Sequence, residues 1–296
     1  MASVTTSHEA NLARFTAAAR RCSWQLLSAY SSSFTLASRL FAPRTREHVA
    51  AIYALVRVAD EIVDGTFAPP TDSAADELTA SLDAYRTEVY GALSRGFSTD
   101  PIVHAFAATA TTHGIGAELI DPFFRSMAMD ITRSEYDAAQ LAEYIRGSAE
   151  VIGEMCMRVF ADGALADDAV AAAAARALGA GFQKVNFLRD LREDTEDLGR
   201  NYFPGRDPRA LTARDVAELC DDMDADFAYA REGIARIPGR DRAAVLAAHG
   251  LFAELSRRLR AAGPERIAAG RVSISSKDKA IIVARAVRDS AVIGKR

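Results

Sequence analysis

Cysteine, proline and net charge are all scarce in this sequence of 296 residues. Its three cysteines, Cys22, Cys156 and Cys220, lie far apart and follow no metal-ligand spacing, which argues against a disulfide framework or a cysteine-bound metal. They predict reduced thiols in a cytoplasmic protein. A net charge of −4 produces no strong positive field, so nucleic acid is not expected as a partner.

Long apolar runs are also missing. The longest stretch, residues 169 to 182, is interrupted by Arg176 and is too short and too rich in alanine to span a bilayer. The N-terminal segment contains Arg14, Arg20 and Arg21 and lacks the apolar part of a secretion signal. These absences predict a cytoplasmic protein whose only membrane contact is peripheral, at the inner face.

Alanine, the strongest helix former, is abundant, whereas the 18 glycines and 9 prolines are mostly clustered. Strand-like alternation is hard to find. Periodicity and end signals predict helices over about residues 43–64, 74–93, 101–113, 117–130, 141–160, 167–197, 212–237, 241–262 and 276–286. We therefore predict an all-α fold, with a flexible lead-in over about residues 1–20 and a single domain over about residues 21–296 whose helices surround a central cavity.

Residues 183–194 combine acids, amides and arginines within about three helical turns. On a helix with about 100° per residue, Gln183, Asn186, Asp190 and Asp194 fall within about 80° of one another. A helix that only packed against others would place apolar residues at this spacing. This one places oxygen atoms there, so we predict that the stripe faces a polar site.

A second stripe of the same kind occurs earlier in the chain. Tyr53, Arg57, Asp60 and Asp64 share one helical face within about 60°, and apolar residues occupy the other faces. A single Asp-x-x-x-Asp pair is more often a solvated helix face. Two such pairs, each with polar neighbours in phase, favour a cavity with two facing acidic walls.

Four facing carboxylates repel one another and are costly to bury unless cations compensate them. Oxygen ligands of this kind select Mg²⁺, or Mn²⁺, over zinc. Arg57, Arg189, Arg200 and Arg271 add planar guanidinium groups that match phosphate oxygens. The combination predicts a diphosphate held by magnesium and arginines, which together neutralise the charge that grows on the leaving group.

Two further segments allow both a structural and a functional interpretation. Ser31, Ser32 and Ser33 precede an apolar helical pattern, which favours an N-cap, although the same groups suit an anion at a helix start. Small residues along the helix predicted over residues 141–160 suit close helix packing and equally leave room for a ligand tail. The five histidines form no Ser-His-Asp or Cys-His arrangement.

At these motifs the chain resembles the squalene/phytoene synthase family. The resemblance runs from about Tyr30 to Arg271 and is densest over YSSSF (residues 30–34), YALVRVADEIVD (residues 53–64), and residues 183–194 with the following YFP (residues 202–204). The run FQKVNFLRDL is most similar to bacterial phytoene synthases of the actinobacterial type. The first acidic motif has Glu61 where many members have a second aspartate, and little effect is expected because the outer pair is kept.

The resemblance implies an isoprenoid synthase fold and a set of site residues. It implies that Mg²⁺ is held by Asp60, Asp64, Asn186, Asp190 and Asp194, and that the four aspartates act in catalysis with Tyr53, Arg57 and Tyr144. Tyr144 would face the carbocation, where an aromatic ring stabilises positive charge. The implied substrate-binding residues are Tyr30, Ser31, Ser32, Ser33, Phe34, Tyr53, Arg57, Ser148, Ala149, Gly153, Gln183, Arg189 and Arg271.

The implied reaction joins two isoprenoid diphosphates head to head. One substrate ionises to an allylic cation, the double bond of the other attacks it, and a cyclopropylcarbinyl diphosphate forms. This intermediate ionises, rearranges and loses a proton to give a conjugated triene, which is phytoene when both substrates are geranylgeranyl diphosphate. Phytoene is the precursor made in carotenoid biosynthesis.

Several alternatives stay open at this point. The lack of a dinucleotide fingerprint favours proton loss over reduction, so no NAD(P)H is expected. A C15 + C15 synthase that makes squalene, dehydrosqualene or presqualene diphosphate is the main alternative, and a catalytically inactive scaffold member of the family is a remote one. The expected partners are isoprenoid diphosphates, with the protein as a monomer or weak homo-oligomer.

Overall fold

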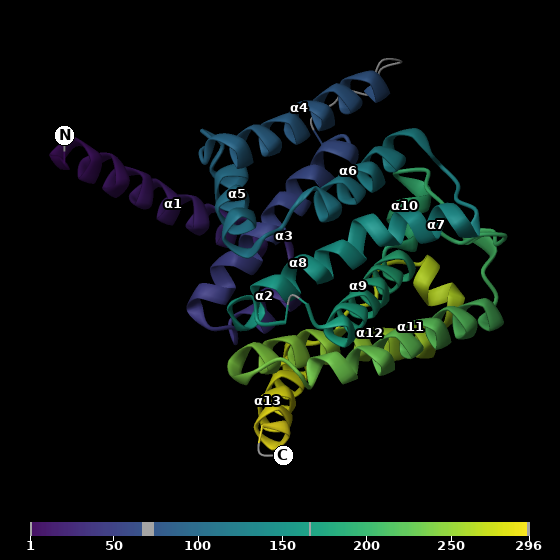
Figure 1. Cartoon of the computed structure of the whole chain (residues 1–296). Helices are drawn as coiled ribbons and strands as arrows, with labels where there is room; N and C mark the ends of the chain where they lie inside the picture. Colours follow the sequence, from purple (N-terminus) through teal and green to yellow (C-terminus); the bar gives the residue numbers. More distant parts are fainter. Residues whose placement is uncertain (1, 67–73, 166, 295–296) are drawn as a thin grey trace.

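Figure 1 shows the computed structural model, in which helices make up most of the chain over the residues that it describes, 2–66, 74–165 and 167–294. No β-strand occurs within these ranges, and the β pairing found there is an isolated bridge between Glu135 and Asn201. None of the helices over these residues is long and apolar enough to cross a membrane. The all-α prediction is confirmed.

The helices follow one another with short connections. In chain order they are α1 (Ala2–Tyr30), α2 (Ser32–Ser38), α3 (Pro43–Val63), α4 (Ala74–Arg95), α5 (Pro101–His113), α6 (Ala117–Thr132), α7 (Ala138–Ile145), α8 (Val151–Val159), α9 (Ala169–Arg189), α10 (Leu191–Glu196), α11 (Ala213–Ile234), α12 (Gly239–Ala268) and α13 (Ser276–Ile293). A π-helical turn, Arg146–Glu150, joins α7 to α8, and 3-10 turns cover Phe160–Gly163 and Pro208–Ala210.

Proline and capping residues begin and end several helices where the sequence predicts. Pro43 and Pro101 occupy the first turn of α3 and α5, where a missing N–H costs no hydrogen bond. The side chain of Asp100 caps α5, and Gly114 ends it in the left-handed conformation with φ 63°. The predicted starts of α3, α4, α5 and α6 agree with the structure.

Helix extends further toward the N-terminus than predicted, and two predicted helices are interrupted. α1 begins at Ala2, so helix covers the segment predicted as a lead-in. The helix predicted over residues 141–160 is interrupted by the π-helical turn. The helix predicted over residues 167–197 breaks at Asp190, whose backbone (φ −100°, ψ 12°) leaves the helical region between α9 and α10. Periodicity does not reveal these features because the residues on either side of each break keep helical spacing.

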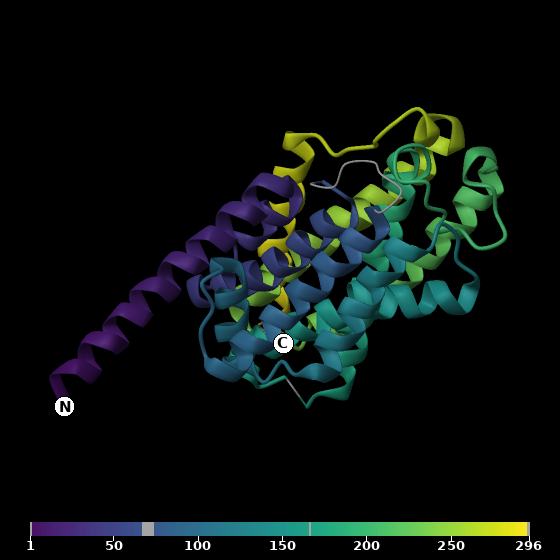
Figure 2. The same cartoon turned by 90° about the horizontal axis from the view of Figure 1, so that it is seen from above.

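Tertiary packing stabilises the C-terminal half of the first helix. α1 packs on α3 and α5, and Ala19, Ala51 and Ala105 from the three helices meet in a small buried cluster. Alanines allow helix backbones to approach closely, so α1 packs tightly against α3 and α5. The weakly amphipathic sequence of α1 does not predict these contacts. Figure 2 shows the N-terminal part of α1 extending away from the rest of the molecule.

Two hydrophobic clusters form most of the core. The first is built mainly from α3 to α6 and α8, with Phe106 and Phe123 fully buried in it. The second is built mainly from α9, α11 and α12, with Leu188 and Met223 fully buried. In Figure 1, α3 to α6 occupy the upper part, α11 and α12 the lower part, and α9 lies between them. Residues from both clusters line one large cavity.

Candidate active site

The cavity has a volume of about 590 Å³ and is lined by residues of α2, α3, α6, α8, α9, α11 and α12. Along α3 and α9 alike, the first lining residues are apolar and the last are acids, as in Val49 before Asp64 and Ala171 before Asp190. Arg200 links the two sets of acids, because its backbone N–H donates to the carbonyl oxygen of Asp194 at 2.7 Å and its side chain pairs with Asp64 at 2.7 Å. The acids therefore share one end of the cavity. The rest of the lining is largely apolar.

Most of the predicted site residues line this cavity. They are Tyr30, Ser31, Phe34, Tyr53, Arg57, Asp60, Asp64, Tyr144, Ser148, Ala149, Gly153, Gln183, Asn186, Arg189, Asp190, Asp194 and Arg271. Ser32 and Ser33 are not among the lining residues. The hydroxyl of exposed Ser32 accepts from Lys279 Nζ at 2.8 Å, and Ser31 caps α2 by accepting from the N–H of Phe34 at 3.2 Å. The N-cap interpretation of Ser31 is confirmed, and α2 turns Ser32 and Ser33 away because successive helical residues point in different directions.

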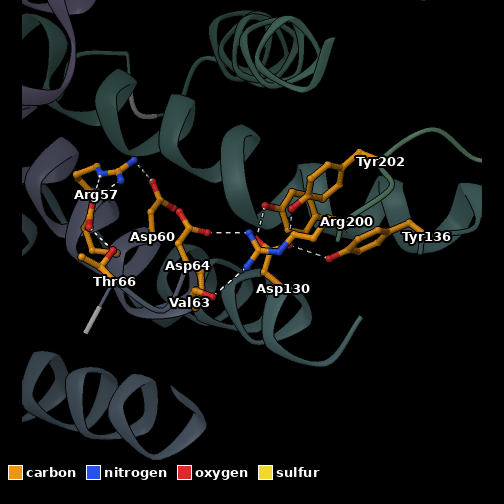
Figure 3. Close-up of polar contacts among 11 residues, drawn as sticks. Arg57, Asp60, Val63, Asp64, Thr66, Asp130, Tyr136, Arg200 and Tyr202 are labelled. Carbon is orange, nitrogen blue, oxygen red and sulfur yellow. Dashed lines mark hydrogen bonds and ion pairs between the residues drawn. The ribbon is translucent and has the colours of Figure 1, made fainter. Parts of the chain in front are cut away.

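Arg57 organises the first acidic wall, which α3 carries. Its guanidinium lies 3.9 Å from Asp60 Oδ2, its Nε donates to Glu61 at 3.0 Å, and the group rests over the ring of Tyr30 at 4.4 Å from the centroid. Figure 3 shows Arg57, Asp60 and Asp64 in sequence along α3. The residue at the departure from the family motif, Glu61, thus binds an arginine and does not line the cavity.

Arg200, from the loop after α10, reaches the end of the same wall. Its side chain is 8% exposed, Nη1 donates to Asp64 Oδ1 at 2.7 Å, and Nη2 donates to the carbonyl oxygen of Val63 at 3.0 Å. In Figure 3 its guanidinium lies between Asp64 and Asp130. Arg200 also lines the cavity, so its predicted contact with a diphosphate stays a prediction beside these bonds to the end of α3.

The second acidic wall is divided between α9 and α10, with Asp190 at the junction. Arg189 pairs with Asp190 through one edge of its guanidinium, with Nε donating to Oδ1 at 2.9 Å and Nη2 donating to Oδ2, and Arg271 Nε lies 3.3 Å from Oδ1. The buried Oδ1 of Asn186 has no hydrogen-bond partner in the described part of the chain. Asp194 makes no ion pair there either.

Burial and mutual repulsion raise the pKa of two wall carboxyls. Burial, followed by the charge of Asp190, raises the pKa of Asp194 to about 8. Burial raises that of Asp60 to about 7 against the opposing effect of Arg57. The Asp60 side chain is 34% exposed, but it is exposed to the cavity and not to bulk solvent, so burial dominates. Each of these two carboxyls therefore needs a further positive charge beside it to stay ionised near neutral pH.

Sequence reasoning missed a buried acid beside the first wall. Asp130, in α6, is 8% exposed and accepts hydroxyl hydrogens from Tyr136 at 2.9 Å, Tyr144 at 2.6 Å and Tyr202 at 2.7 Å. A signal was present, because Asp130 is in phase with the buried Met127 on the apolar face of its helix. An acid in that position requires hydrogen-bonding partners from elsewhere.

The small residues of α8 and the π-helical turn bring α9 close. A Cβ on Gly153 would lie 2.3 Å from the carbonyl oxygen of Ala175, and one on Gly179 would lie 2.4 Å from that of Ala149. The close-packing interpretation is confirmed. Ser148, Ala149 and Gly153 also line the cavity, so their contact with a substrate tail stays a prediction.

The fit of the site to a metal ion rests on its donor atoms. Within the described ranges, no group of three His, Cys, Asp or Glu side chains is arranged to hold a metal ion, and Asp60, Asp64 and Asp190 are paired with arginines. The donors nevertheless suit a hard cation, since they are all oxygens and include the unpartnered Oδ1 of Asn186 and the poorly compensated Asp194.

A family model of squalene/phytoene synthases matches residues 27–278 of this chain. The chain belongs to the squalene/phytoene synthase family. It is an enzyme of the prenyltransferase type. The predicted family and enzyme class are confirmed.

Its relatives include both branches of the family. The 15-cis-phytoene synthase of Paracoccus sp. is 29% identical over 250 residues, 79% of this chain and 80% of that protein. The phytoene synthase of Mycobacterium tuberculosis is 30% identical over 285 residues, 88% of each chain. The hydroxysqualene synthase of Sinorhizobium fredii is 30% identical over 189 residues, 63% of this chain and 59% of that protein.

A solved structure confirms the fold. The crystal structure of a dehydrosqualene synthase in complex with a ligand matches with a TM-score of 0.79 at 17% identity, covering 94% of this chain and 98% of that one. The predicted isoprenoid synthase fold is therefore correct.

Proposed function

We propose that this enzyme condenses two molecules of geranylgeranyl diphosphate head to head, through a cyclopropylcarbinyl (prephytoene) diphosphate, to phytoene in carotenoid biosynthesis. The observation that carries the proposal is one cavity with two acidic walls and arginines at one end and a largely apolar lining elsewhere. Phytoene synthases that match most of this chain at 29% and 30% identity support the substrate length.

In this proposal the wall oxygens bind Mg²⁺, or Mn²⁺ in its place, through Asp60, Asp64, Asn186, Asp190 and Asp194. When bound, the ion neutralises negative charge on the leaving diphosphate. No NAD(P)H takes part, because the proposed reaction ends in the loss of a proton and not in a reduction. The protein's own task is to hold the diphosphate, orient the prenyl chains and keep water away from the cation.

Arg57, Arg189 and Arg271 bind the diphosphate in this proposal. All three line the cavity, and each lies in an ion pair with an acid of a wall. A guanidinium has five N–H donors in a planar fork, so it can keep a carboxylate contact and still donate to phosphate oxygens. The walls therefore orient the arginines before substrate arrives.

Aromatic side chains protect the carbocation. Burial raises the pKa of Tyr53 to about 12, so its phenol stays neutral, and its ring stacks on Phe34 with centroids 5.8 Å apart. Tyr144 is 4% exposed and also lines the cavity. Electron-rich ring faces attract positive charge. The exclusion of water allows the cation to rearrange and lose a proton before hydrolysis.

The alternative is a C15 + C15 condensation to squalene, dehydrosqualene or presqualene diphosphate, and the hydroxysqualene synthase relative favours it. The acidic walls serve either reaction, so the apolar part of the cavity decides between them. A product assay with purified protein and Mg²⁺, offering farnesyl and geranylgeranyl diphosphate separately with and without NADPH, tests the proposal. A C40 triene from geranylgeranyl diphosphate alone supports it, a C30 product supports the alternative, and no product from either supports the inactive scaffold.

We also propose a peripheral contact between α13 and an anionic membrane at the cytoplasmic face. Ile281, Val287 and Val292 on this helix are 40%, 46% and 52% exposed, beside exposed Lys277 and Arg285. Apolar residues next to cations suit a lipid headgroup region. Cosedimentation with anionic vesicles tests this contact, and the double variant Ile281→Ser/Val292→Ser should lose it. A wild-type protein that stays in solution contradicts the contact.

We propose that the protein is a monomer or a weak homo-oligomer, and light scattering tests this.

A further inference from the structure

Asp130 is the centre of a group that we call the tyrosine cluster: Asp130, Tyr136, Tyr144 and Tyr202. Its two carboxylate oxygens receive three hydroxyl groups, Tyr136 and Tyr202 on Oδ1 at 2.9 and 2.7 Å and Tyr144 on Oδ2 at 2.6 Å. Figure 3 shows Tyr136 and Tyr202 converging on the carboxylate from the side away from Asp64. One acid therefore ties together residues of α6, α7 and two loops.

The rings of the cluster also pack on one another. The ring centroid of Tyr144 lies 5.3 Å from that of Tyr136 and 5.2 Å from that of Tyr202. Tyr202 also stacks on Phe187, with ring centroids 4.3 Å apart and an interplanar angle of 15°. No ring can swing away from the cluster without losing a hydrogen bond to the carboxylate, and a hydrogen bond to a charged acceptor is about twice as strong as a neutral one. Tyr144, Tyr202 and Asp130 line the cavity, whereas Tyr136 is not among its lining residues.

The direction of the hydrogen bonds determines how electron-rich the tyrosine side chains that line the cavity are. Burial, together with the charge of Asp130, raises the pKa of all three tyrosines, so each phenol keeps its proton and donates it. A phenol that donates to a carboxylate has a more electron-rich ring and oxygen than one that donates to water. The ring faces and hydroxyl oxygens of Tyr144 and Tyr202 therefore offer electron density to the cavity, and neither side chain is a free nucleophile.

We propose that Asp130 is a positioning residue that fixes and polarises Tyr144 and Tyr202 so that their side of the cavity stabilises the carbocation formed from the cyclopropylcarbinyl intermediate. The proposal rests on the proposed function of the site. In that step the bond from carbon to diphosphate oxygen breaks, the electron pair leaves with the diphosphate, and the cation must survive rearrangement before it loses a proton. The allylic cation of the first step lies beside the double bond of the second substrate, which attacks it. This cation therefore depends less on Tyr144 and Tyr202.

The test measures which product leaves the enzyme. Asp130→Asn keeps the shape of the side chain but removes the charge and turns one acceptor into a donor. With Mg²⁺ and the diphosphate that the wild type uses, triene formation should fall about tenfold with little change in KM, and a larger share of product should be the released cyclopropylcarbinyl diphosphate. Tyr144→Phe should shift the product ratio in the same direction, and Tyr136→Phe, outside the cavity lining, should shift it less.

Asp241→Asn is the matched control. Asp241 is also 8% exposed and accepts from Thr45 Oγ1 at 3.0 Å, but it does not line the cavity. This variant should lower the midpoint of thermal unfolding and leave the product ratio unchanged.

Three outcomes separate the possibilities. A wild-type product ratio in folded Asp130→Asn, with activity lost only in proportion to folded protein, overturns the proposal. If Asp130→Asn does not fold, a wild-type ratio in both Tyr144→Phe and Tyr202→Phe overturns it. A wild-type enzyme that makes no product from either diphosphate contradicts the proposed function instead.

Discussion

The two acidic walls contain the same spacing of aspartates, but the chain builds them differently. The first lies on one continuous helix, α3, and its acids are paired separately, Asp60 with Arg57 of the same helix and Asp64 with Arg200 from a distant loop. Each aspartate of this wall lies near a cation, although Arg57 also binds Glu61. Both aspartates therefore have a cation in place before any ligand binds.

The second wall breaks at Asp190, and both nearby arginines act on that one residue. Arg189 and Arg271 pair with Asp190, while Asp194 has no ion pair among the described residues and its pKa is raised to about 8. The same motif thus produces one compensated and one partly uncompensated wall. A cation entering the cavity gains most at the second wall, because electrostatic stabilisation is greatest where charge is least compensated.

The largest expected effect comes from removing one carboxylate from either wall. Asp60→Asn and Asp194→Asn should each lower kcat/KM by about 10²–10³, because in the proposed function these carboxylates hold the Mg²⁺ that would compensate the charge of the leaving diphosphate. Asp197→Asn, an exposed acid just after α10, is the control and should have no effect. Steady-state kinetics with Mg²⁺ measure all three. Near-normal activity in either wall variant would show that only one wall takes part.

Removing the cation that pairs with Asp64 should mainly affect folding. Arg200→Ala leaves Asp64 without its partner at 2.7 Å in a largely buried setting, and should lower the free energy of unfolding by about 3 kcal/mol. Arg192→Ala is the control, because its ion pair with Glu196 is 56% and 55% exposed and should contribute less than about 1 kcal/mol. Urea unfolding of both variants measures the difference, and equal losses would contradict this account.

A glycine substitution tests the packing behind the second wall. Gly179→Ala places a Cβ 2.4 Å from the carbonyl oxygen of Ala149, and the overpacking should cost about 2 kcal/mol of stability. In Gly91→Ala the new Cβ meets only the movable end of Arg95, so helix propensity should stabilise the protein by up to about 1 kcal/mol. Thermal unfolding compares the two. A stabilised Gly179→Ala would mean that α8 and α9 can separate freely.

The smallest expected effect concerns His48, on the helix of the first wall. Burial, followed by the positive charge of His113, lowers its pKa to about 3. Because its ordinary pKa is about 6.5, the unfolded chain binds a proton that the folded chain does not, and stability should fall by about 1.4 kcal/mol per pH unit below about pH 6.5. His48→Gln should lack this part of the decrease. Parallel slopes for both proteins between pH 8 and pH 5.5 would contradict the assignment.

Much of the site was predictable because helical periodicity is local. Residues three or four apart share a helix face whatever the rest of the chain does, so Tyr53, Arg57, Asp60 and Asp64 were recognised as one stripe. The pairing of two such stripes predicted a shared cavity, and the structure brings them together. The assignment of Mg²⁺ and of the prenyl chain length stays a prediction, because neither depends on the spacing of the residues alone.

Other features needed partners that are distant in sequence. Asp190, at the break between α9 and α10, forms an ion pair with Arg271, which lies far along the chain. In the tyrosine cluster, Asp130 accepts a hydrogen bond from Tyr202, 72 positions later. Ser32 belongs to the predicted serine motif, but its hydroxyl oxygen accepts a hydrogen bond from Lys279. No local pattern contains these contacts.

The sequence by itself determined the all-α class, the two oxygen-rich stripes and the family, because each depends on residue type and short-range spacing. Only the tertiary structure decided which carboxylate meets which arginine, which small residues bring α8 and α9 together, and that a buried acid holds three tyrosines. The physical reason is that charge compensation, close packing and burial are properties of side chains that meet in space, and the helical spacing of one segment does not specify the segment that packs against it.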